Sequence, residues 1–149
     1  MHAAPRVLII EDNHDAAESL RQVLELLGCS VIVSYTGLDG IKAAKQFGPD
    51  VVICDIGLPG VDGIGVAGAL REDERTADVT LIALTGYGQK ELREAAMKVG
   101  FDDYLVKPAR MPRLFDIISA ATERRRAGPE AAATPRAESR TSPSSTEGS

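Results

Sequence analysis

Five short runs of apolar, largely β-branched residues recur along the chain, at residues 6–10, 30–34, 50–54, 80–84 and 103–107. The first reads "RVLII" and the third "DVVIC", and none of them alternates strictly between apolar and polar positions. Continuous apolar runs of this length are typical of strands that are covered on both faces. The pattern therefore predicts five buried strands.

The segments between these runs have the spacing of amphipathic helices, which we expect over about residues 15–27, 38–47, 62–71, 90–99 and 111–126. The first would end before Gly28 and the fourth before Gly100, since glycine favours the position just past a helix. The expected core stripe of the fourth consists of Leu92, Ala95, Ala96 and Val99.

The third of these helices has the weakest pattern. It contains Gly63, Gly65 and Gly68, and an interior glycine costs a helix about 1 kcal/mol relative to alanine. We expect this helix to be short or mobile.

Strand and helix alternate five times, which predicts an α/β domain with a doubly wound parallel sheet and helices on both faces. Residues 1–126 would form this domain. From residue 127 onward the chain is rich in Ser, Thr, Pro and Ala and has almost no large apolar side chain, so we expect a disordered tail over 127–149.

The net charge, the number of cysteines and the length of the apolar runs exclude several classes of function. A formal charge of −5 is opposite to the excess of Lys and Arg that nucleic-acid binding needs, so a protein or small-molecule partner is favoured. The two cysteines are too few for a disulfide framework or a zinc site, and no apolar stretch is long enough to cross a bilayer or resembles a secretory signal. We expect a cytoplasmic protein with no membrane insertion.

Polar side chains collect where the predicted strands end. Glu11 and Asp12 follow the first run, Asp55 the third, Thr85 the fourth and Lys107 the fifth. The carboxyl ends of parallel strands lie along one edge of the sheet, where ligands bind in such folds. The sequence thus predicts three carboxylates, one hydroxyl and one ammonium at the same edge.

Three neighbouring carboxylates repel one another, and a hard divalent cation that prefers oxygen ligands, most plausibly Mg²⁺, would relieve this repulsion. A carboxylate beside a metal, a lysine and a hydroxyl suits phosphoryl transfer, because the cations neutralise phosphoryl oxygens while the carboxylate attacks. Asp55 is the predicted nucleophile.

Each of these residues also has a simpler interpretation. Asp55 could cap a turn, Glu11 and Asp12 could cap the helix that follows them, and Lys107 could be a solvated lysine. Capping does not explain a hydroxyl and an ammonium at the matching strand ends. "ERRR" at 123–126 is interpreted as the solvated end of the last helix, and "GIGVAG" at 63–68 is not taken as a dinucleotide motif because it does not open directly off a strand.

The sequence resembles the response regulator receiver domains of two-component signalling. The resemblance covers residues 6–121 and depends on "IIEDN", "VVICDIGLPGVDG", "LIALTGYG" and "YLVKP" in this order and spacing. It implies a receiver domain at residues 1–126 with a flavodoxin-like sheet of order 2-1-3-4-5.

The resemblance also implies a role for individual residues. Asp55 matches the phosphoacceptor, Glu11 and Asp12 match the acidic pair that holds Mg²⁺, and the backbone carbonyl of Gly57 matches a further metal ligand. Thr85 matches the hydroxyl that follows the phosphoryl group, Lys107 the cation that binds its oxygen, and Tyr104 the aromatic residue coupled to Thr85. The family also holds the peptide between Lys107 and Pro108 in the cis form.

Two positions depart from common family patterns. Gly57, two residues after the acceptor, has no side chain, and Tyr87, two residues after Thr85, is bulky where polar residues are frequent. Both positions tune the lifetime of the phosphorylated state within the family.

By resemblance, the protein would be a phosphorelay switch. It would accept a phosphoryl group from a histidine kinase or histidine phosphotransfer protein, signal to a downstream protein target, and catalyse only its own phosphorylation and dephosphorylation. One alternative is a Mg²⁺-dependent phosphatase with an aspartyl nucleophile, but such enzymes usually carry a second acid where this chain has Gly57. Another is a receiver that binds partners without phosphorylation.

Overall fold

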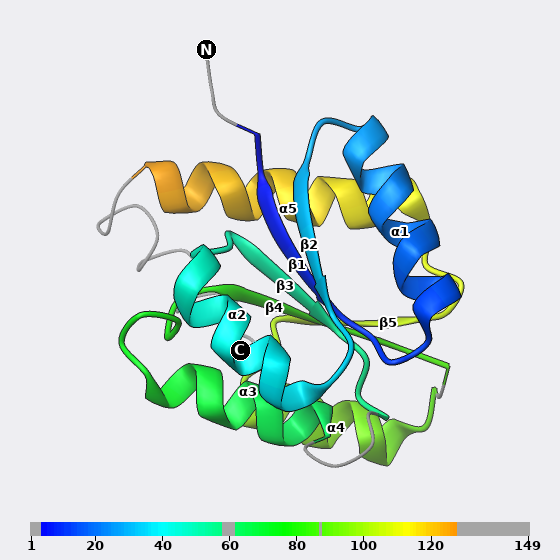
Figure 1. The fold of residues 1–149 in the computed structure, drawn as a ribbon. Coiled ribbons are helices and arrows are strands. Elements are labelled where there is room, and N and C mark those ends of the chain that lie inside the picture. Colours follow the sequence, from blue (N-terminus) through cyan, green and yellow to red (C-terminus); the bar gives the residue numbers. More distant parts are fainter. Residues whose placement is uncertain (1–3, 58–61, 87, 128–149) are drawn as a thin grey trace.

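A computed structural model describes residues 4–57, 62–86 and 88–127. Five strands and five helices alternate along this part of the chain (Figure 1). The strands are β1 (Arg6–Ile10), β2 (Ser30–Ser34), β3 (Val51–Cys54), β4 (Thr80–Thr85) and β5 (Asp103–Val106). The helices are α1 (His14–Leu26), α2 (Gly37–Phe47), α3 (Gly63–Glu72), α4 (Lys90–Val99) and α5 (Met111–Arg126).

The strands form one parallel sheet in the order β2-β1-β3-β4-β5. Helices α1 and α5 cover one face of the sheet, and α2, α3 and α4 cover the other (Figure 1). This arrangement confirms the predicted doubly wound α/β fold and the strand order implied by the family resemblance.

The sheet separates two apolar layers. Successive side chains of a strand point to opposite faces, and in β1 both sets are buried. Leu8 and Ile10 pack with α2 and α3, while Val7 and Ile9 pack with α1 and α5. This double burial is the physical reason why the strand sequences do not alternate.

Helix α3 forms in spite of its glycines. It has ten residues, as many as α4, and lies within one residue of the expected range 62–71, so the glycines do not shorten it. The side chain of Asp62 caps it by accepting a hydrogen bond from the Gly65 N–H at 2.9 Å, and Val66 and Leu70 are fully buried against the core. The hydrogen bond from the cap and the burial of these apolar side chains offset the loss of helix stability caused by the glycines.

The core stripe of α4 is narrower than predicted. Ala95 is exposed, and Ala96 is the only fully buried member of the predicted stripe. Of the expected tail, Ala127 is the cap residue of α5, and the rest lies outside the described residues.

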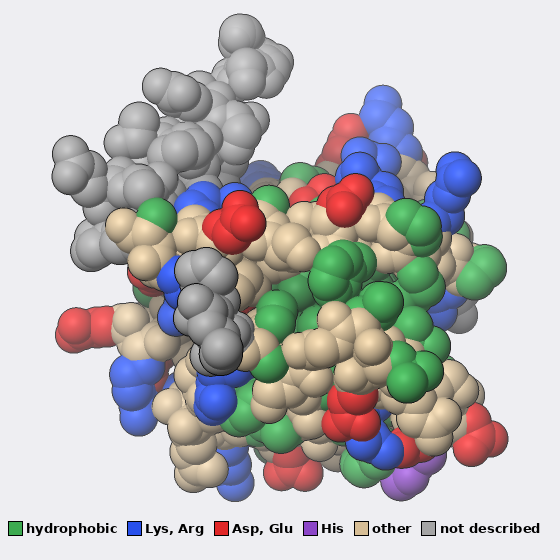
Figure 2. All heavy atoms as spheres, turned by 90° about the horizontal axis from the view of Figure 1, so that it is seen from above, with side chains coloured by type: hydrophobic (Ala, Val, Ile, Leu, Met, Phe, Trp, Pro, Cys, Tyr) green, Lys and Arg blue, Asp and Glu red, His purple; other side chains and the backbone are tan. Residues whose placement is uncertain are grey.

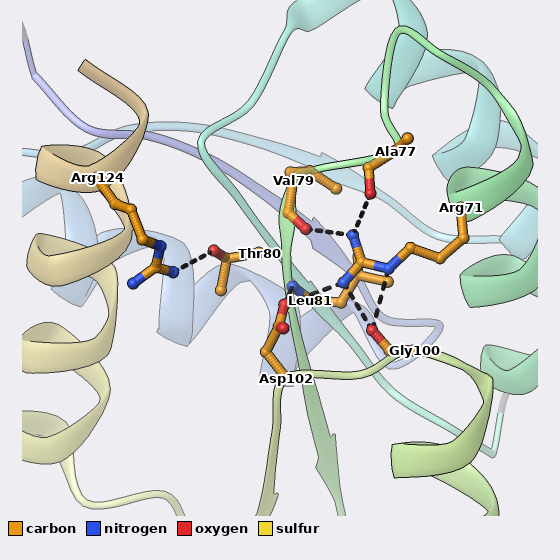
Figure 3. A network of polar contacts seen from close by, with 8 residues as sticks. All are labelled: Arg71, Ala77, Val79, Thr80, Leu81, Gly100, Asp102 and Arg124. Carbon is orange, nitrogen blue, oxygen red and sulfur yellow. Dashed lines mark hydrogen bonds and ion pairs between the residues drawn. The ribbon is translucent and has the colours of Figure 1, made fainter. Parts of the chain in front are cut away.

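The basic end of α5 does not extend freely into solvent as the sequence suggested. Arg125 and Arg126 form ion pairs with Asp50, at 3.3 and 3.6 Å. Figure 3 shows that Arg124 points toward Thr80, and it donates a hydrogen bond to the Thr80 hydroxyl at 3.1 Å. Asp50 lies at the start of β3 and is only 6% exposed, and a buried carboxylate requires cationic or donor partners. These contacts attach the end of α5 to the amino-terminal edge of the sheet.

A second arginine network lies on the other face at the same edge. Arg71, near the end of α3, donates to the carbonyl oxygens of Val79, Ala77 and Gly100 at 2.6, 2.8 and 2.6 Å and pairs with the Asp102 carboxylate at 3.0 Å (Figure 3). Asp102 in turn accepts the Leu81 N–H at 2.9 Å. One side chain therefore links α3 to the loops that enter β4 and β5.

Among the described helices, none has the length and apolar character required to traverse a bilayer.

Candidate functional site

Three of the predicted site residues lie just past the carboxyl ends of their strands, and each is held by a backbone hydrogen bond that continues the strand pairing. The Glu11 N–H donates to Ser34 O at 3.0 Å, the Asp55 N–H to Ile10 O at 3.0 Å, and the Lys107 N–H to Thr85 O at 2.7 Å. The backbones of Glu11, Asp55 and Lys107 are therefore fixed to the sheet although these residues follow its strands.

The three predicted acids form a compact cluster. Glu11, Asp12 and Asp55 each place a carboxylate oxygen within 4.8 Å of the others. Glu11 is 6% exposed, Asp55 is partly buried and Asp12 is exposed. The cluster thus runs from the interior of the domain to its surface.

Asp55 is oriented by contacts to both carboxylate oxygens. Its Oδ1 accepts the Gly57 N–H at 2.9 Å, and its Oδ2 lies 3.5 Å from Lys107 Nζ. The first contact is the turn-capping role considered from the sequence. The second contact shows that Asp55 also belongs to a cluster of charged side chains that contains Lys107 and the neighbouring acids.

The capping interpretation of Glu11 and Asp12 is wrong. Asn13 caps α1, with its side chain accepting the Ala16 N–H at 2.9 Å. Glu11 Oε1 instead accepts a hydrogen bond from Lys107 Nζ at 2.5 Å, and Oε2 accepts the Asn13 N–H at 3.0 Å. Lys107 is therefore paired with an acid rather than merely solvated.

Burial and charge set the protonation of this pair. Burial raises the pKa of the Glu11 carboxyl, and the hydrogen bonds from Lys107 and the Asn13 N–H offset part of that rise. For Lys107, burial lowers the pKa, but the hydrogen bond to Glu11 and the charge of Asp55 outweigh it, so the pKa lies above its ordinary value. Lys107 is consequently a cation throughout the physiological pH range.

The donor set fits a divalent metal ion. The cluster offers only carboxylate oxygens, which suit a hard cation such as Mg²⁺, and the oxygens are close enough together to share one ion. Glu11 and Asp55 already accept hydrogen bonds at both carboxylate oxygens, so the exposed Asp12 is the acid most available to bind a metal directly.

Thr85 and Tyr104 lie on the neighbouring strands β4 and β5. Thr85 is the fully buried last residue of β4, and Tyr104 on β5 pairs with Ala83 in the sheet. Ala83 and Tyr104 both belong to the apolar layer under α3 and α4, and alternation along β4 directs Thr85 to the same side. The two predicted switch residues thus face α4, whereas Glu11, Asp55 and Lys107 line the side of α1 and α5.

The structure also describes the peptide that follows Lys107 and the side chains of Cys54 and His14. The peptide between Lys107 and Pro108 is cis, as the family resemblance implied. Cys54 is fully buried, and burial raises the pKa of its thiol far above the usual range, so the thiol is unreactive. His14 is exposed and stacks on Tyr35 with ring centres 3.8 Å apart. Tyr87 lies outside the described residues.

An apolar groove that the sequence did not reveal opens beside the cluster. It has a volume of about 510 Å³ and runs between α1 and the start of α5, with Glu11, Asp55 and Lys107 in its wall. Figure 2 shows apolar side chains gathered on this side of the molecule, in the view from above. The apolar lining includes Ile9, Ala16, Leu20, Val23, Ile53, Leu84 and Met111. Val23, which lines this groove, is 38% exposed.

Comparisons with known proteins agree with the geometry. The response regulator receiver domain family matches residues 7–119. The chain is 37% identical over 128 residues to the DNA-binding dual master transcriptional regulator RpaA of a Synechocystis species, a match covering 86% of this chain and 53% of that protein. It is 32% identical over 114 residues to the polar-differentiation response regulator DivK of Brucella ovis, covering 76% and 93%.

The chain thus spans about half the length of the transcriptional regulators it matches. Among solved structures, it is similar to the receiver domain of a sensor histidine kinase from Pseudomonas aeruginosa, with 28% identity and a TM-score of 0.75, covering 81% of this chain and 99% of that one. That crystal structure has a magnesium ion coordinated in the active site cleft. A response regulator from Chloroflexus aurantiacus is similar with 29% identity and a TM-score of 0.76, covering 81% and 99%.

Proposed function

The chain belongs to the response regulator receiver domain family, and from this we propose that it is a phosphorelay switch that accepts a phosphoryl group on Asp55. The observation that carries the proposal is the position of Asp55 between a carboxylate cluster and the Lys107 ammonium. The donor would be a phosphohistidine on a histidine kinase or histidine phosphotransfer protein in the cytoplasm. The chain would catalyse only its own phosphorylation and dephosphorylation.

The transfer uses the contacts already formed by Asp55. One carboxylate oxygen attacks phosphorus, an O–P bond forms, the N–P bond of the phosphohistidine breaks, and the imidazole takes the bonding electrons. The Gly57 N–H, 2.9 Å from Oδ1, holds the carboxylate in place. Lys107, 3.5 Å from Oδ2, is positioned to bind an oxygen of the incoming phosphoryl group.

Asp12 and Asp55, with Glu11 and the Gly57 carbonyl, are the residues that would hold Mg²⁺. When bound, the ion neutralises negative charge on the carboxylates and on the phosphoryl oxygens. Charge neutralisation also explains why the protein can assemble three acids within 4.8 Å of one another.

The signal would pass from Lys107 and Thr85 to the α4 side of the sheet. Lys107 is hydrogen-bonded through its backbone to Thr85, and its side chain is shared between Glu11 and Asp55. A phosphoryl group on Asp55 would compete with Glu11 for the ammonium and offer a new acceptor to the Thr85 hydroxyl. Tyr104, on the same face as Thr85, would report the change to a downstream protein target.

Beryllofluoride, a phosphoryl mimic, tests this switch without a donor protein. With Mg²⁺ present, we expect it to shift the NMR signals of the Tyr104 ring, assigned with Tyr104→Phe, because the mimic adds an acceptor beside Thr85. When Mg²⁺ is chelated, adding beryllofluoride should leave the spectrum unchanged. A Tyr104 ring that does not respond in the presence of Mg²⁺ would contradict the proposed relay.

The groove between α1 and α5 is the surface on which we place the phosphodonor protein. It combines apolar lining with direct access to Asp55, so an apolar helix face docked there would bring its histidine to the acceptor. Val23 is both a lining residue and solvent-exposed, which makes it available to such a partner.

Val23→Asp should therefore slow phosphotransfer from the protein donor about 10-fold or more, because a charge at the docking surface must be desolvated. The rate with acetyl phosphate should stay unchanged, since the small donor needs no docking surface. Leu38→Asp is the matched control, because Leu38 is 59% exposed on α2 at the opposite face. Equal slowing with both donors would indicate damage to the site rather than to docking.

A further inference from the structure

Gly63, the first residue of α3, lies against the backbone of the acceptor segment. A Cβ atom placed on it would be 2.5 Å from the Ile56 Cα and 2.8 Å from the Asp55 carbonyl oxygen. Real Cβ atoms essentially never approach backbone this closely. The Gly63 N–H also donates to the Ile56 carbonyl at 3.0 Å, which draws the two segments together.

Space, rather than backbone conformation, requires glycine here. Among the described glycines, those with a positive φ are Gly28, Gly48 and Gly100, and Gly63 is not one of them. Gly68, five residues further along α3, has only ordinary contact, with the Val99 Cγ2 3.9 Å from its ideal Cβ. The requirement therefore applies to Gly63 at the start of α3 and does not apply to Gly68.

The atoms touched by Gly63 belong to the segment that presents the acceptor. Residues 55–57 are held by the sheet on one side, through the Asp55 N–H bond to Ile10 O, and by Gly63 on the other. Restoring ordinary contact to a Cβ would require a displacement of about 1 Å at Ile56. A displacement of that size would move Asp55 relative to Glu11, Asp12 and Lys107.

We propose that Gly63 is a positioning residue for phosphoryl transfer: its missing side chain lets α3 begin directly against residues 55–56, and this contact sets the place of the Asp55 carboxylate and the Gly57 carbonyl. The inference depends on the proposed function for its catalytic meaning. It also accounts for a glycine at a helix start where most side chains are compatible with the backbone.

The test compares the full chain with Gly63→Ala, Gly68→Ala and the double variant Gly63→Ala/Gly68→Ala. Each is measured for Mg²⁺ affinity by calorimetry, for the initial rate with acetyl phosphate at saturating Mg²⁺, and for the urea midpoint of unfolding. Gly63→Ala should fold, bind Mg²⁺ roughly 10-fold more weakly and react roughly 10- to 100-fold more slowly. Gly68→Ala should retain wild-type affinity and rate with an equal or higher urea midpoint.

The outcomes separate this inference from the proposed function. Wild-type affinity and rate in Gly63→Ala would overturn the positioning role. So would failure of both Gly63→Ala proteins to fold, because Gly63 would then serve the fold and not the site. If the wild type and Gly68→Ala are not modified by acetyl phosphate, the proposed function fails, while the Mg²⁺ affinities still decide whether Gly63 positions the carboxylates.

Discussion

Asp55→Asn is expected to reduce phosphoryl uptake to background, with both acetyl phosphate and a phosphohistidine donor. An amide oxygen is a far weaker nucleophile than a carboxylate oxygen, and the substitution also removes a negative charge from the proposed metal site. The measurement is the stoichiometry of labelled phosphate retained by the protein after a fixed reaction time.

Asp55→Asn should lose phosphoryl uptake because the nucleophile is missing, and not because the domain is destabilised. Asparagine has the same shape as aspartate, and its Oδ1 can still accept the Gly57 N–H, so the urea midpoint should remain close to that of the wild type. Asp62→Asn is the matched control, because Asp62 is exposed and caps α3, a role that asparagine fills equally well. Full labelling of Asp62→Asn is expected. Comparable labelling of Asp55→Asn would show that another residue accepts the phosphoryl group.

Arg71→Met is expected to produce the largest loss of stability, about 3 kcal/mol or more in the free energy of unfolding. The side chain is 17% exposed, and it donates to three carbonyl oxygens as well as to Asp102. Methionine matches the apolar stem but supplies no donor, so these acceptors and the mostly buried Asp102 carboxylate lose their arginine partner. Urea unfolding monitored by circular dichroism measures the change, with an unaltered m-value expected.

Arg75→Met provides the comparison for this prediction. Arg75 also pairs with an aspartate, Asp73, at 2.9 Å, but its side chain is 63% exposed, so solvent screens the interaction. We expect little change in its urea midpoint. Equal destabilisation by the two substitutions would mean that the hydrogen bonds of Arg71 contribute no more than a surface ion pair.

The sheet could be predicted because each strand is an apolar run buried on both faces, and the intervening helices carry a stripe of apolar residues. The candidate site followed from the sheet, since polar residues at the carboxyl ends of parallel strands meet at one edge. Asp55 and Lys107 are 52 positions apart in sequence, yet their strand ends predicted that they would lie at the same edge, where the structure brings their side chains into contact.

Side-chain partnerships could not be predicted in the same way. The pairing of Lys107 with Glu11 and of Arg125 with Asp50 depends on which long side chain reaches which buried acid, and no local pattern specifies that choice. The bounds of α3 were predicted to within one residue, but helix propensity counts its glycines only as costs. Gly63 is instead required by a backbone approach that exists only in the folded domain.

Phosphoryl transfer to this chain would form one covalent bond, between an Asp55 carboxylate oxygen and phosphorus. Reaction of the wild-type chain with acetyl phosphate and Mg²⁺, followed by borohydride reduction of the acyl phosphate and peptide mass spectrometry, locates that bond directly. We predict homoserine at position 55 alone, and only when Mg²⁺ is present. Reduction at any other aspartate or glutamate, or an equal yield with the metal chelated, would contradict the account.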